Sequence, residues 1–520
     1  MYSSVYAGAL RGILAYLVQT EVDAAQGLPG LELVGYLAGE VKEARERVRV
    51  ALKNVGIDLP PMRITVNLSP ADVRKDGTGF DLPIAVGILG ALGKIPESSF
   101  RDTLFIGELG LDGKLRRVRG ILPIVRAAAE SGLTRCVVPA ENACEGSVVK
   151  GIEVVGAESM AQLLEYLRAD EKKRSSILPP ITSSEQASGP LSEPDGGETP
   201  DFADIAGQEM VKRVAEIAAA GFHNMLIIGP PGTGKTMVGK RIPGILPPMT
   251  LQESMEVSNI YSIQGLLNAS RTLVTERPFV SPHHTVSAQA LAGGGTIPRP
   301  GAVSLAHRGV LFLDELPEFP RAVLDLLRQP LEEKRVVISR NYGSYCYPAD
   351  FMLVAAMNPC PCGYYPDLNR CTCSEAQVRR YLGHISGPVL DRIDLCVEAP
   401  ALDIRRLGSR DEHTDSRAMR GHVETARRFQ EKRFAGTGYR FNSEIQARDM
   451  QKYCALGTQE ERLLEKLMQQ QEISARAYHR LLRTARTIAD LEESERIGRT
   501  HLAEALCYRV MDTKYRRGKG

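Results

Sequence analysis

The first 170 residues alternate between the two spacings of apolar positions that distinguish strands from helices. Residues 63–68, Arg-Ile-Thr-Val-Asn-Leu, alternate as a half-buried strand does, whereas residues 82–92 are apolar, rich in Ala and Gly, and typical of a buried helix. The other elements predicted in this stretch are strands at 104–106 and 136–138 and helices at 40–53 and 120–131. This interleaving predicts a mixed α/β domain over residues 1–170.

The rest of the chain divides at two changes of pattern. Residues 171–199 are rich in Ser, Pro and Gly and contain no aromatic residue, which favours a flexible linker. A strand–loop–helix unit then opens a second α/β domain, predicted over residues 200–405. Beyond it the apolar spacing is helical, which predicts a helical domain over residues 406–520. Helices of this last domain are predicted to begin at Thr458, Ser474 and Thr500.

Composition and charge narrow the classes of function. The 65 Lys and Arg against 63 Asp and Glu give a net charge of +2, which excludes a globally basic nucleic-acid coat protein. Any contact with DNA must therefore come from local basic patches. No apolar run reaches the roughly 18 residues of a membrane helix, and Arg11 interrupts the apolar start of the chain, which argues against a signal peptide. We expect a cytoplasmic protein without membrane contact.

A glycine-rich loop follows the apolar strand at 225–228 and matches the pattern G-x-x-x-x-G-K-T. Its glycines allow backbone N–H groups to surround phosphate oxygens at the beginning of a helix. Lys235 is expected to reach the β- and γ-phosphates of ATP, and the Thr236 hydroxyl to ligate Mg²⁺. The predicted ATP-binding residues are Gly229, Pro230, Pro231, Gly232, Thr233, Gly234, Lys235 and Thr236.

Two later apolar strands end in polar residues that suit nucleotide hydrolysis. The first ends in Asp314 and Glu315. We expect Asp314 to hold the Mg²⁺ and Glu315 to orient and polarise the attacking water. The second, at 351–357, ends in Asn358, whose amide can hold the same water; a turn-forming Asn before a proline is the alternative.

Together these residues resemble the AAA+ ATPases over about residues 200–510. The resemblance implies an arginine finger at Arg392, which enters the nucleotide site of a neighbouring subunit and stabilises transition-state charge. It also implies a second sensor arginine at Arg476 and an adenine-pocket segment at 204–208. A surface or salt-bridged side chain is the alternative for either arginine.

The segment between the phosphate loop and Asn358 narrows the resemblance. The stretches that carry it begin at Arg277 (RPFVSPHHT), Gly293 (GGG), Pro298 (PRPG), Leu305 (LAHRG), Lys334 (KRVVISRNYG) and Asn358 (NPCPCG). They are similar to the magnesium-chelatase-like branch and, over nearly the whole chain, to its ComM or YifB-type ATPases.

In that branch, an insert in the second helix and a hairpin before the first sensor face the central pore of the ring. The matching residues here are roughly 277–300 and 334–347. They bring cations that suit phosphates and tyrosines that suit stacking on bases. Solvated hairpin charges and packing aromatics are the alternative. The predicted DNA contacts are Arg277, Arg299, Lys334, Arg335 and Arg340.

Four of the ten cysteines lie close together as Cys360-Pro-Cys362 and Cys371-Thr-Cys373. Four thiolates on two short turns can close a tetrahedral site for structural Zn²⁺. The surrounding residues are typical of a loop, which argues against four core-filling cysteines. An iron–sulfur cluster and reversible disulfides are the alternatives.

The N-terminal module contains segments at 75–81 and 107–114 that resemble the proteolytic domain of Lon. Lon uses a Ser–Lys dyad, a nucleophile beside its base. Aligned residue by residue, its Ser position falls on Gly79 and its Lys position falls near Leu122. The resemblance therefore implies a Lon-protease-like α/β fold and argues against protease activity.

The sequence thus predicts an ATP-hydrolysing motor that forms a ring, expected to be a hexamer, and acts on single-stranded or branched DNA. The family resemblance implies a branch-migration helicase that acts on recombination intermediates in natural transformation. Its expected cofactors are ATP, Mg²⁺ and structural Zn²⁺. The alternatives are a magnesium-chelatase-type motor for metal insertion and an ATP-dependent protease or unfoldase.

Overall fold

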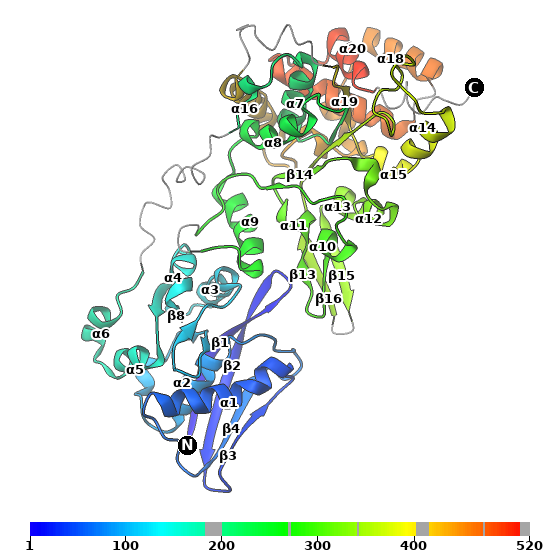
Figure 1. Ribbon diagram of the computed structural model, residues 1–520. Helices are drawn as coiled ribbons and strands as arrows, with labels where there is room; N and C mark the ends of the chain where they lie inside the picture. Colours follow the sequence, from blue (N-terminus) through cyan, green and yellow to red (C-terminus); the bar gives the residue numbers. More distant parts are fainter. Residues whose placement is uncertain (182–199, 269–271, 341–342, 402–414, 472–473, 510–520) are drawn as a thin grey trace.

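The computed structural model describes residues 1–181, 200–268, 272–340, 343–401, 415–471 and 474–509. The chain forms two lobes that meet at a narrow waist (Figure 1). The N-terminal domain makes one lobe, and the phosphate-loop domain with the C-terminal helices makes the other. The predicted α/β class is confirmed, with parallel strands at the centre of the nucleotide-binding lobe. Among the described residues, none of the helices combines the length and the apolar character that crossing a bilayer requires.

A mixed seven-stranded sheet, in the order β3-β4-β2-β1-β5-β8-β9, forms the N-terminal domain. Helix α2 is buried on nearly every side, as its apolar sequence requires, and packs against the sheet and α1. The elements are β1 (Tyr2–Arg11), β2 (Leu14–Ala25), β3 (Gly30–Val34), α1 (Gly39–Asn54), β4 (Arg63–Ser69), α2 (Asp81–Ala91), β5 (Thr103–Phe105), β6 (Glu108–Leu109), β7 (Leu115–Arg116), α3 (Ile121–Glu130), β8 (Arg135–Pro139), α4 (Ala140–Gly146), β9 (Glu153–Ala157), α5 (Met160–Arg168) and α6 (Glu171–Ile177).

A parallel five-stranded sheet, in the order β11-β14-β17-β10-β18, forms the second domain. The three central strands, β14, β17 and β10, are apolar throughout because helices or hairpins cover both faces. The elements are α7 (Glu209–Gly221), β10 (Met225–Ile228), α8 (Lys235–Ile245), α9 (Leu251–Gln264), β11 (Phe279–Val280), α10 (Ala288–Ala292), β12 (Gly293–Gly294), β13 (Arg299–Pro300), α11 (Ala302–Leu305), β14 (Val310–Leu313), α12 (Arg321–Asp325), α13 (Arg328–Glu333), β15 (Arg335–Arg340), β16 (Gly343–Pro348), β17 (Met352–Met357), α14 (Glu375–Leu382), α15 (Gly387–Leu390) and β18 (Leu395–Glu398).

The C-terminal helices share one apolar core with the phosphate-loop domain. Val423 and Ile488 belong to the same buried cluster as Val214 on α7 and Val354 on β17. These helices therefore cover one side of the nucleotide-binding domain instead of forming a separate core. They are α16 (Ser416–Phe434), α17 (Met450–Tyr453), α18 (Thr458–Gln471), α19 (Ala475–Leu491) and α20 (Arg499–Cys507).

Two local predictions need correction. Residues 171–177, assigned to the linker, form helix α6, and Pro180 bridges to Val155 of β9, so the described N-terminal domain continues to residue 181. The remainder of the predicted linker lies outside the described residues. Helix α20 begins at Arg499, before Thr500, because the His501 ring accepts the backbone N–H of Gly498 and caps the helix.

The turn of the β1–β2 hairpin reaches the second domain. It extends from the N-terminal sheet toward hairpin β15–β16 (Figure 1). Ile13, in this turn, packs against the apolar cluster beneath the β15–β16 hairpin. A second contact joins α3 to α9, where the N–H of Gly120 donates to the Ser262 carbonyl at 3.0 Å. The two domains are therefore joined by apolar packing and by hydrogen bonds.

Candidate functional site

The phosphate loop lies at the carboxyl end of β10, the strand between β17 and β18 in the parallel sheet. Gly232 and Gly234 have φ of 79° and 80°, in the left-handed region that favours glycine. A β-carbon on Gly229 would lie 2.5 Å from the carbonyl oxygen of Ala399, so this position admits only glycine. The loop leads directly into α8, whose first N–H groups are free to face an anion.

Lys235 folds back over the loop that precedes it. Its Nζ donates to the carbonyl oxygens of Gly229 and Pro230, each at 2.8 Å, and to Oδ1 of Asn358 at 3.2 Å. Burial lowers the pKa of Lys235, while Asp314 and Glu315 oppose that shift. The ammonium group is thus held beside the loop by neutral acceptors that the phosphates of a nucleotide can replace.

The acids predicted for catalysis lie next to the phosphate loop. The Thr236 hydroxyl donates to Oδ2 of Asp314 at 2.6 Å, so the two predicted Mg²⁺ ligands are adjacent. Oxygen ligands of this kind fit Mg²⁺, which would neutralise phosphate charge when bound. Glu315 follows with φ of 52°, a strained value for a non-glycine residue, and its exposed carboxylate lies 3.4 Å from Nδ1 of His284. No local pattern of residues predicts this histidine contact.

Gln208 places an amide between the phosphate loop and the end of β18. Its Nε2 donates to the carbonyl oxygens of Thr233 and Pro400, at 3.3 and 2.9 Å. Its buried Oε1 has no hydrogen-bond partner among the residues that the structure describes. A buried acceptor without a partner is costly, so a donor such as an adenine amino group would satisfy it. Within the predicted adenine segment, Asp204 is instead paired with Arg241 at 2.6 Å.

Arg392 and Arg476 both lie away from the phosphate loop of their own chain. They line a cavity of about 960 Å³ that Lys235, Thr236 and the catalytic acids do not line. Arg392 forms an ion pair with Glu332, and Nη2 of Arg476 lies 4.0 Å from the same carboxylate. Nε of Arg392 is buried and has no acceptor in the described part of the chain. Neither arginine therefore lies at the phosphate loop of its own chain.

The four cysteines of the predicted metal site converge. Their sulfur atoms all lie within 4.8 Å of one another, with Sγ of Cys360 and Cys362 3.3 Å apart. Burial acts to raise the pKa of the Cys362 thiol, but backbone N–H groups and the neighbouring thiols lower it to about 6. This thiol set fits a soft, tetrahedral metal ion. The loop also contacts the nucleotide site, since a β-carbon on Gly363 would lie 2.5 Å from Pro231.

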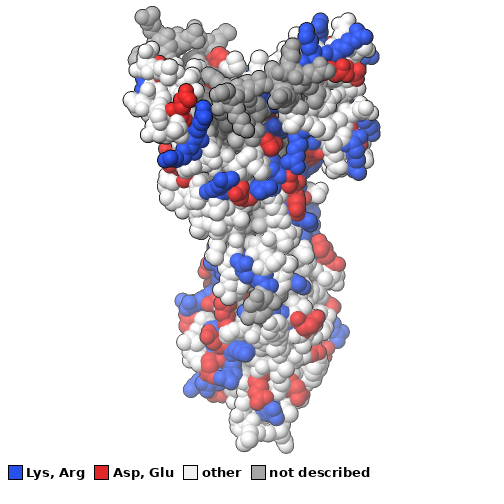
Figure 2. Space-filling model, turned by 90° about the vertical axis from the view of Figure 1, so that its right-hand side faces the viewer, with Lys and Arg blue, Asp and Glu red and all other residues white. Residues whose placement is uncertain are grey.

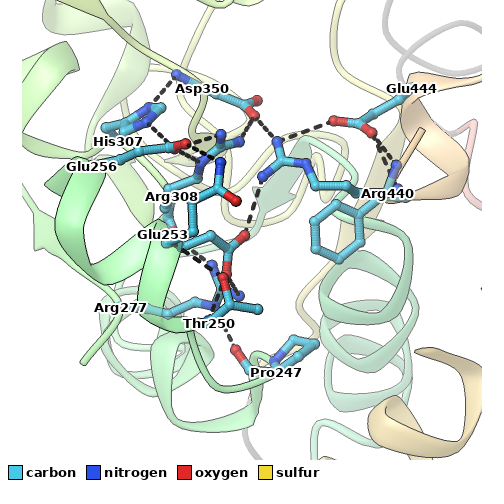
Figure 3. A network of polar contacts seen from close by, with 12 residues as sticks. Pro247, Thr250, Glu253, Glu256, Arg277, His307, Arg308, Asp350, Arg440 and Glu444 are labelled. Carbon is cyan, nitrogen blue, oxygen red and sulfur yellow. Dashed lines mark hydrogen bonds and ion pairs between the residues drawn. The ribbon is translucent and has the colours of Figure 1, made fainter. Parts of the chain in front are cut away.

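Arg277 does not fit its predicted role as a DNA contact. Its side chain is buried at 4% exposure, and Nε and Nη1 donate to the carbonyl oxygens of Pro247 and Arg308 at 2.5 and 2.6 Å. Its Nη2 lies 3.3 Å from Glu253 (Figure 3). With these donors occupied inside the domain, a phosphate outside cannot reach the guanidinium group.

Lys334 belongs to the other end of the same polar network. Its Nζ lies 3.4 Å from Asp350 and also pairs with Glu444 of the C-terminal region. Arg440 bridges Asp350 at 2.6 Å and Glu253 at 3.1 Å (Figure 3). Lys334 is thus half exposed but neutralised, and the network joins α9, the base of hairpin β15–β16 and the C-terminal helices.

The other three predicted DNA contacts are exposed. Arg299 lies on β13, and Arg335 and Arg340 lie at the two ends of β15. Arg335 pairs with the exposed Glu333 at 3.2 Å, whereas Arg340 donates from Nε to the Gly295 carbonyl at 3.3 Å. The structure therefore separates the five predicted residues into two held by carboxylates inside the domain and three on its surface.

Comparison with known proteins places the chain in a family. The family model described as Magnesium chelatase, subunit ChlI matches residues 201–407, and models for Subunit ChlI of Mg-chelatase and for the subunit ChlI C-terminal region match 20–142 and 413–509. The chain is 44% identical to Competence protein ComM of Haemophilus influenzae over 511 residues, 98% of this chain and 97% of that protein. The chain belongs to the ComM/YifB-type magnesium-chelatase-like family.

Two further relatives show how far the likeness extends. YifB of Escherichia coli is 41% identical over 512 residues, again 98% of this chain and 97% of that protein. The Magnesium-chelatase 38 kDa subunit of Cereibacter sphaeroides is 29% identical over only 174 residues, 30% of this chain and 52% of that protein. The ComM/YifB-type likeness therefore includes the N-terminal domain. Membership in this family identifies the phosphate-loop domain as a magnesium-chelatase-like AAA+ ATPase core.

Proposed function

We propose that this protein is an ATP-driven ring motor that moves along DNA and promotes branch migration of recombination intermediates. The observation that carries the motor assignment is the meeting of Lys235, Thr236, Asp314 and Asn358 at one edge of the parallel sheet. Lys235 binds phosphate, Thr236 and Asp314 hold Mg²⁺, and Glu315 orients the attacking water. Asn358 positions that water or the γ-phosphate.

Ring formation supplies the groups that the single chain does not bring to its own nucleotide. Arg392 and Arg476 line a cavity apart from the phosphate loop and share Glu332. In the proposed hexamer both guanidinium groups face the ATP of the neighbouring subunit. There they stabilise the charge that develops on the transferred phosphoryl group. Hydrolysis therefore requires assembly.

The proposal that the motor moves along DNA rests on the family likeness and on the charge of the protein surface. Competence protein ComM matches 98% of this chain, whereas the chelatase subunit matches 30%. Arg299, Arg335 and Arg340 are exposed on neighbouring hairpins and suit phosphate contacts. From the family resemblance, we propose that the substrate is a junction formed when incoming DNA is integrated.

A structural Zn²⁺ is part of the proposal. The cluster of Cys360, Cys362, Cys371 and Cys373 begins two residues after Asn358 and touches the phosphate loop through Gly363 and Pro231. A closed four-thiolate site would fix the end of β17 and so hold Asn358 toward Lys235.

The test is ATP hydrolysis measured with the full chain alone, with a four-way DNA junction, with protoporphyrin plus chelatase partner subunits, and with an unfolded protein. The proposal predicts stimulation by the junction. Stimulation only by the porphyrin system would identify a chelatase motor, and stimulation only by unfolded protein would identify an unfoldase. Sedimentation with and without ATP in the same samples reports whether the stimulated species is a ring.

A further inference from the structure

Arginines of the N-terminal domain lie beside the exposed hairpins of the second domain. Arg11 ends β1, and its Nη2 lies 3.2 Å from the position of a β-carbon on Gly343, the first residue of β16. Arg119 lies in the loop between β7 and α3, and its side chain runs within 3.2 Å of a β-carbon position on Gly265, at the end of α9. Both arginines are exposed.

These two arginines extend the surface that carries Arg299 and Arg340. Arg299 lies close enough to Arg119 to act on its charge, and its strand partner across β12–β13 is Gly294. Nη2 of Arg340 lies 3.3 Å from a β-carbon position on Gly294. The basic strip is defined here as Arg11, Arg119, Arg299 and Arg340; it comes from three strands and one loop and crosses the domain junction. Figure 2 shows Lys and Arg side chains at the narrow waist between the lobes.

The basic strip has no counter-charge of its own. Within the described ranges, no carboxylate lies within 4.0 Å of any of its four guanidinium groups, although ion pairs are frequent elsewhere on the chain. Burial and the like charges of Arg299 and Arg117 lower the pKa of Arg119, and no acid offsets them. Crowded cations of this kind gain stability when an anion joins them.

The strip is not needed to hold the two domains together. That junction uses the hydrogen bond from Gly120 to the Ser262 carbonyl, the Ser262 hydroxyl on Glu145, and Arg117 on the Leu267 carbonyl. Among the described residues, the side chains of Arg11, Arg119 and Arg299 donate no hydrogen bond. An exposed arginine that donates no hydrogen bond within the protein keeps its donors for a ligand, and its planar fork matches phosphate oxygens.

We propose that the N-terminal domain binds the phosphate backbone of the DNA through Arg11 and Arg119, in line with Arg299 and Arg340. This inference rests on the proposed function, because it takes the DNA of the motor to be the polyanion. An open, linear set of cations suits an extended backbone better than a small anion, which requires a pocket. In this arrangement the N-terminal domain guides the DNA toward the hairpins of the second domain. The protease-like fold then has a binding role without protease activity.

The test compares Arg11→Ala/Arg119→Ala with Arg45→Ala/Arg101→Ala in the full chain. The control pair removes the same charge from exposed positions of the same domain, where each arginine is paired with a glutamate. Binding of a fluorescent four-way junction is measured over a series of KCl concentrations, with ring size measured alongside. We expect the strip variant to lose roughly ten-fold in affinity per phosphate contact at 0.1 M salt. The slope of log K against log salt should fall by about 0.9 per contact.

Two further variants separate the possible failures. Arg11→Lys/Arg119→Lys keeps the charge, so it should restore most of the salt slope. Unchanged affinity and slope in the alanine variant would overturn this inference. If Arg335→Ala/Arg340→Ala still weakened binding in that case, the proposed DNA motor would stand. If the wild-type chain bound neither the junction nor single-stranded DNA, that result would contradict both the proposed function and this inference.

Discussion

The nucleotide-site residues and the expected DNA contacts are both predicted from positions spread over more than 60 residues of the chain. The structure brings the first set together but divides the second. At the nucleotide site, Lys235, Thr236, Asp314 and Asn358 meet within hydrogen-bond distance. Among the expected DNA contacts, Arg277 turns inward and Lys334 is neutralised by Asp350 and Glu444. Only the remaining arginines stay open to a ligand.

The difference lies in what fixes each side chain. The nucleotide residues follow the carboxyl ends of β10, β14 and β17, which are neighbours in a parallel sheet, so the topology alone brings them to one edge. The basic residues lie on hairpins and inserts, where spacing in the sequence does not fix which side of the backbone faces solvent. A carboxylate from a distant part of the chain can then form an ion pair with a cation that was expected to bind DNA.

The largest effect is expected from separating phosphate binding from water activation. Lys235→Ala should abolish measurable ATP binding, because it removes the charge that faces the phosphates. Glu315→Gln should bind ATP normally but hydrolyse it about 10²–10⁴-fold more slowly, because the amide cannot polarise the water. Equilibrium binding of a fluorescent ATP analogue and single-turnover hydrolysis report the two steps. Equal ATP affinity in the Lys235 variant would show that the loop does not hold the nucleotide.

The next largest effect is expected on DNA binding, where the exposed Arg335 and Arg340 should differ from the buried Arg277. Arg335→Ala/Arg340→Ala should weaken DNA binding by roughly ten-fold per phosphate contact and flatten its salt dependence. Arg277→Ala should leave the salt slope unchanged and cost about 3 kcal/mol of stability, because it removes the buried hydrogen bonds to the carbonyl oxygens of Pro247 and Arg308 and one of the two cations paired with Glu253. DNA titrations at several salt concentrations and thermal unfolding of both variants decide the matter. A flatter salt slope for Arg277→Ala would restore it as a DNA contact.

The cysteine cluster tests how strongly the nucleotide site depends on its surroundings. Cys371→Ser/Cys373→Ser should release about one Zn²⁺ per chain and lower the affinity for ATP without abolishing it, since Gly363 supports Pro231. Cys507→Ser, at an exposed free cysteine, is the matched control. Elemental analysis after purification under reducing conditions measures the metal. Iron with visible absorbance would indicate an iron–sulfur cluster instead of zinc. Protein that contains neither metal would contradict the proposed metal site.

The smallest effect concerns the polar network and pH. A hydrogen bond from His307, together with Arg308, lowers the pKa of Glu256 from 4.5 to about 2, although burial opposes the shift. A carboxyl with a depressed folded pKa stabilises the fold above pH 4.5 and loses that contribution as the pH falls toward 2. Glu256→Gln should therefore cost about 1–3 kcal/mol at neutral pH and reduce the acid sensitivity between those values. Urea unfolding at several pH values measures it, with the exposed Glu375→Gln as control.

Much of the fold followed from the sequence where the pattern was local. The strand at 63–68 is β4 and the apolar helix at 82–92 is α2. The hairpin that the family resemblance implies at 334–347 is β15–β16. The linker boundary was placed too early because α6 is short and polar, and its position depends on contacts with α5. The sequence could not place His284 beside Glu315 or Glu332 between Arg392 and Arg476, because these pairs form only in the folded chain.

In the proposed function, ATP hydrolysis at the phosphate loop moves DNA through the ring. The most direct measurement is the conversion of a labelled four-way junction into its duplex products by the full chain with ATP, compared with Glu315→Gln under the same conditions. We expect the wild-type protein to form product at a rate that follows ATP hydrolysis, and Glu315→Gln to bind the junction without converting it. Equal conversion by both proteins, or ATP hydrolysis by the wild type that neither responds to nor converts the junction, would contradict it.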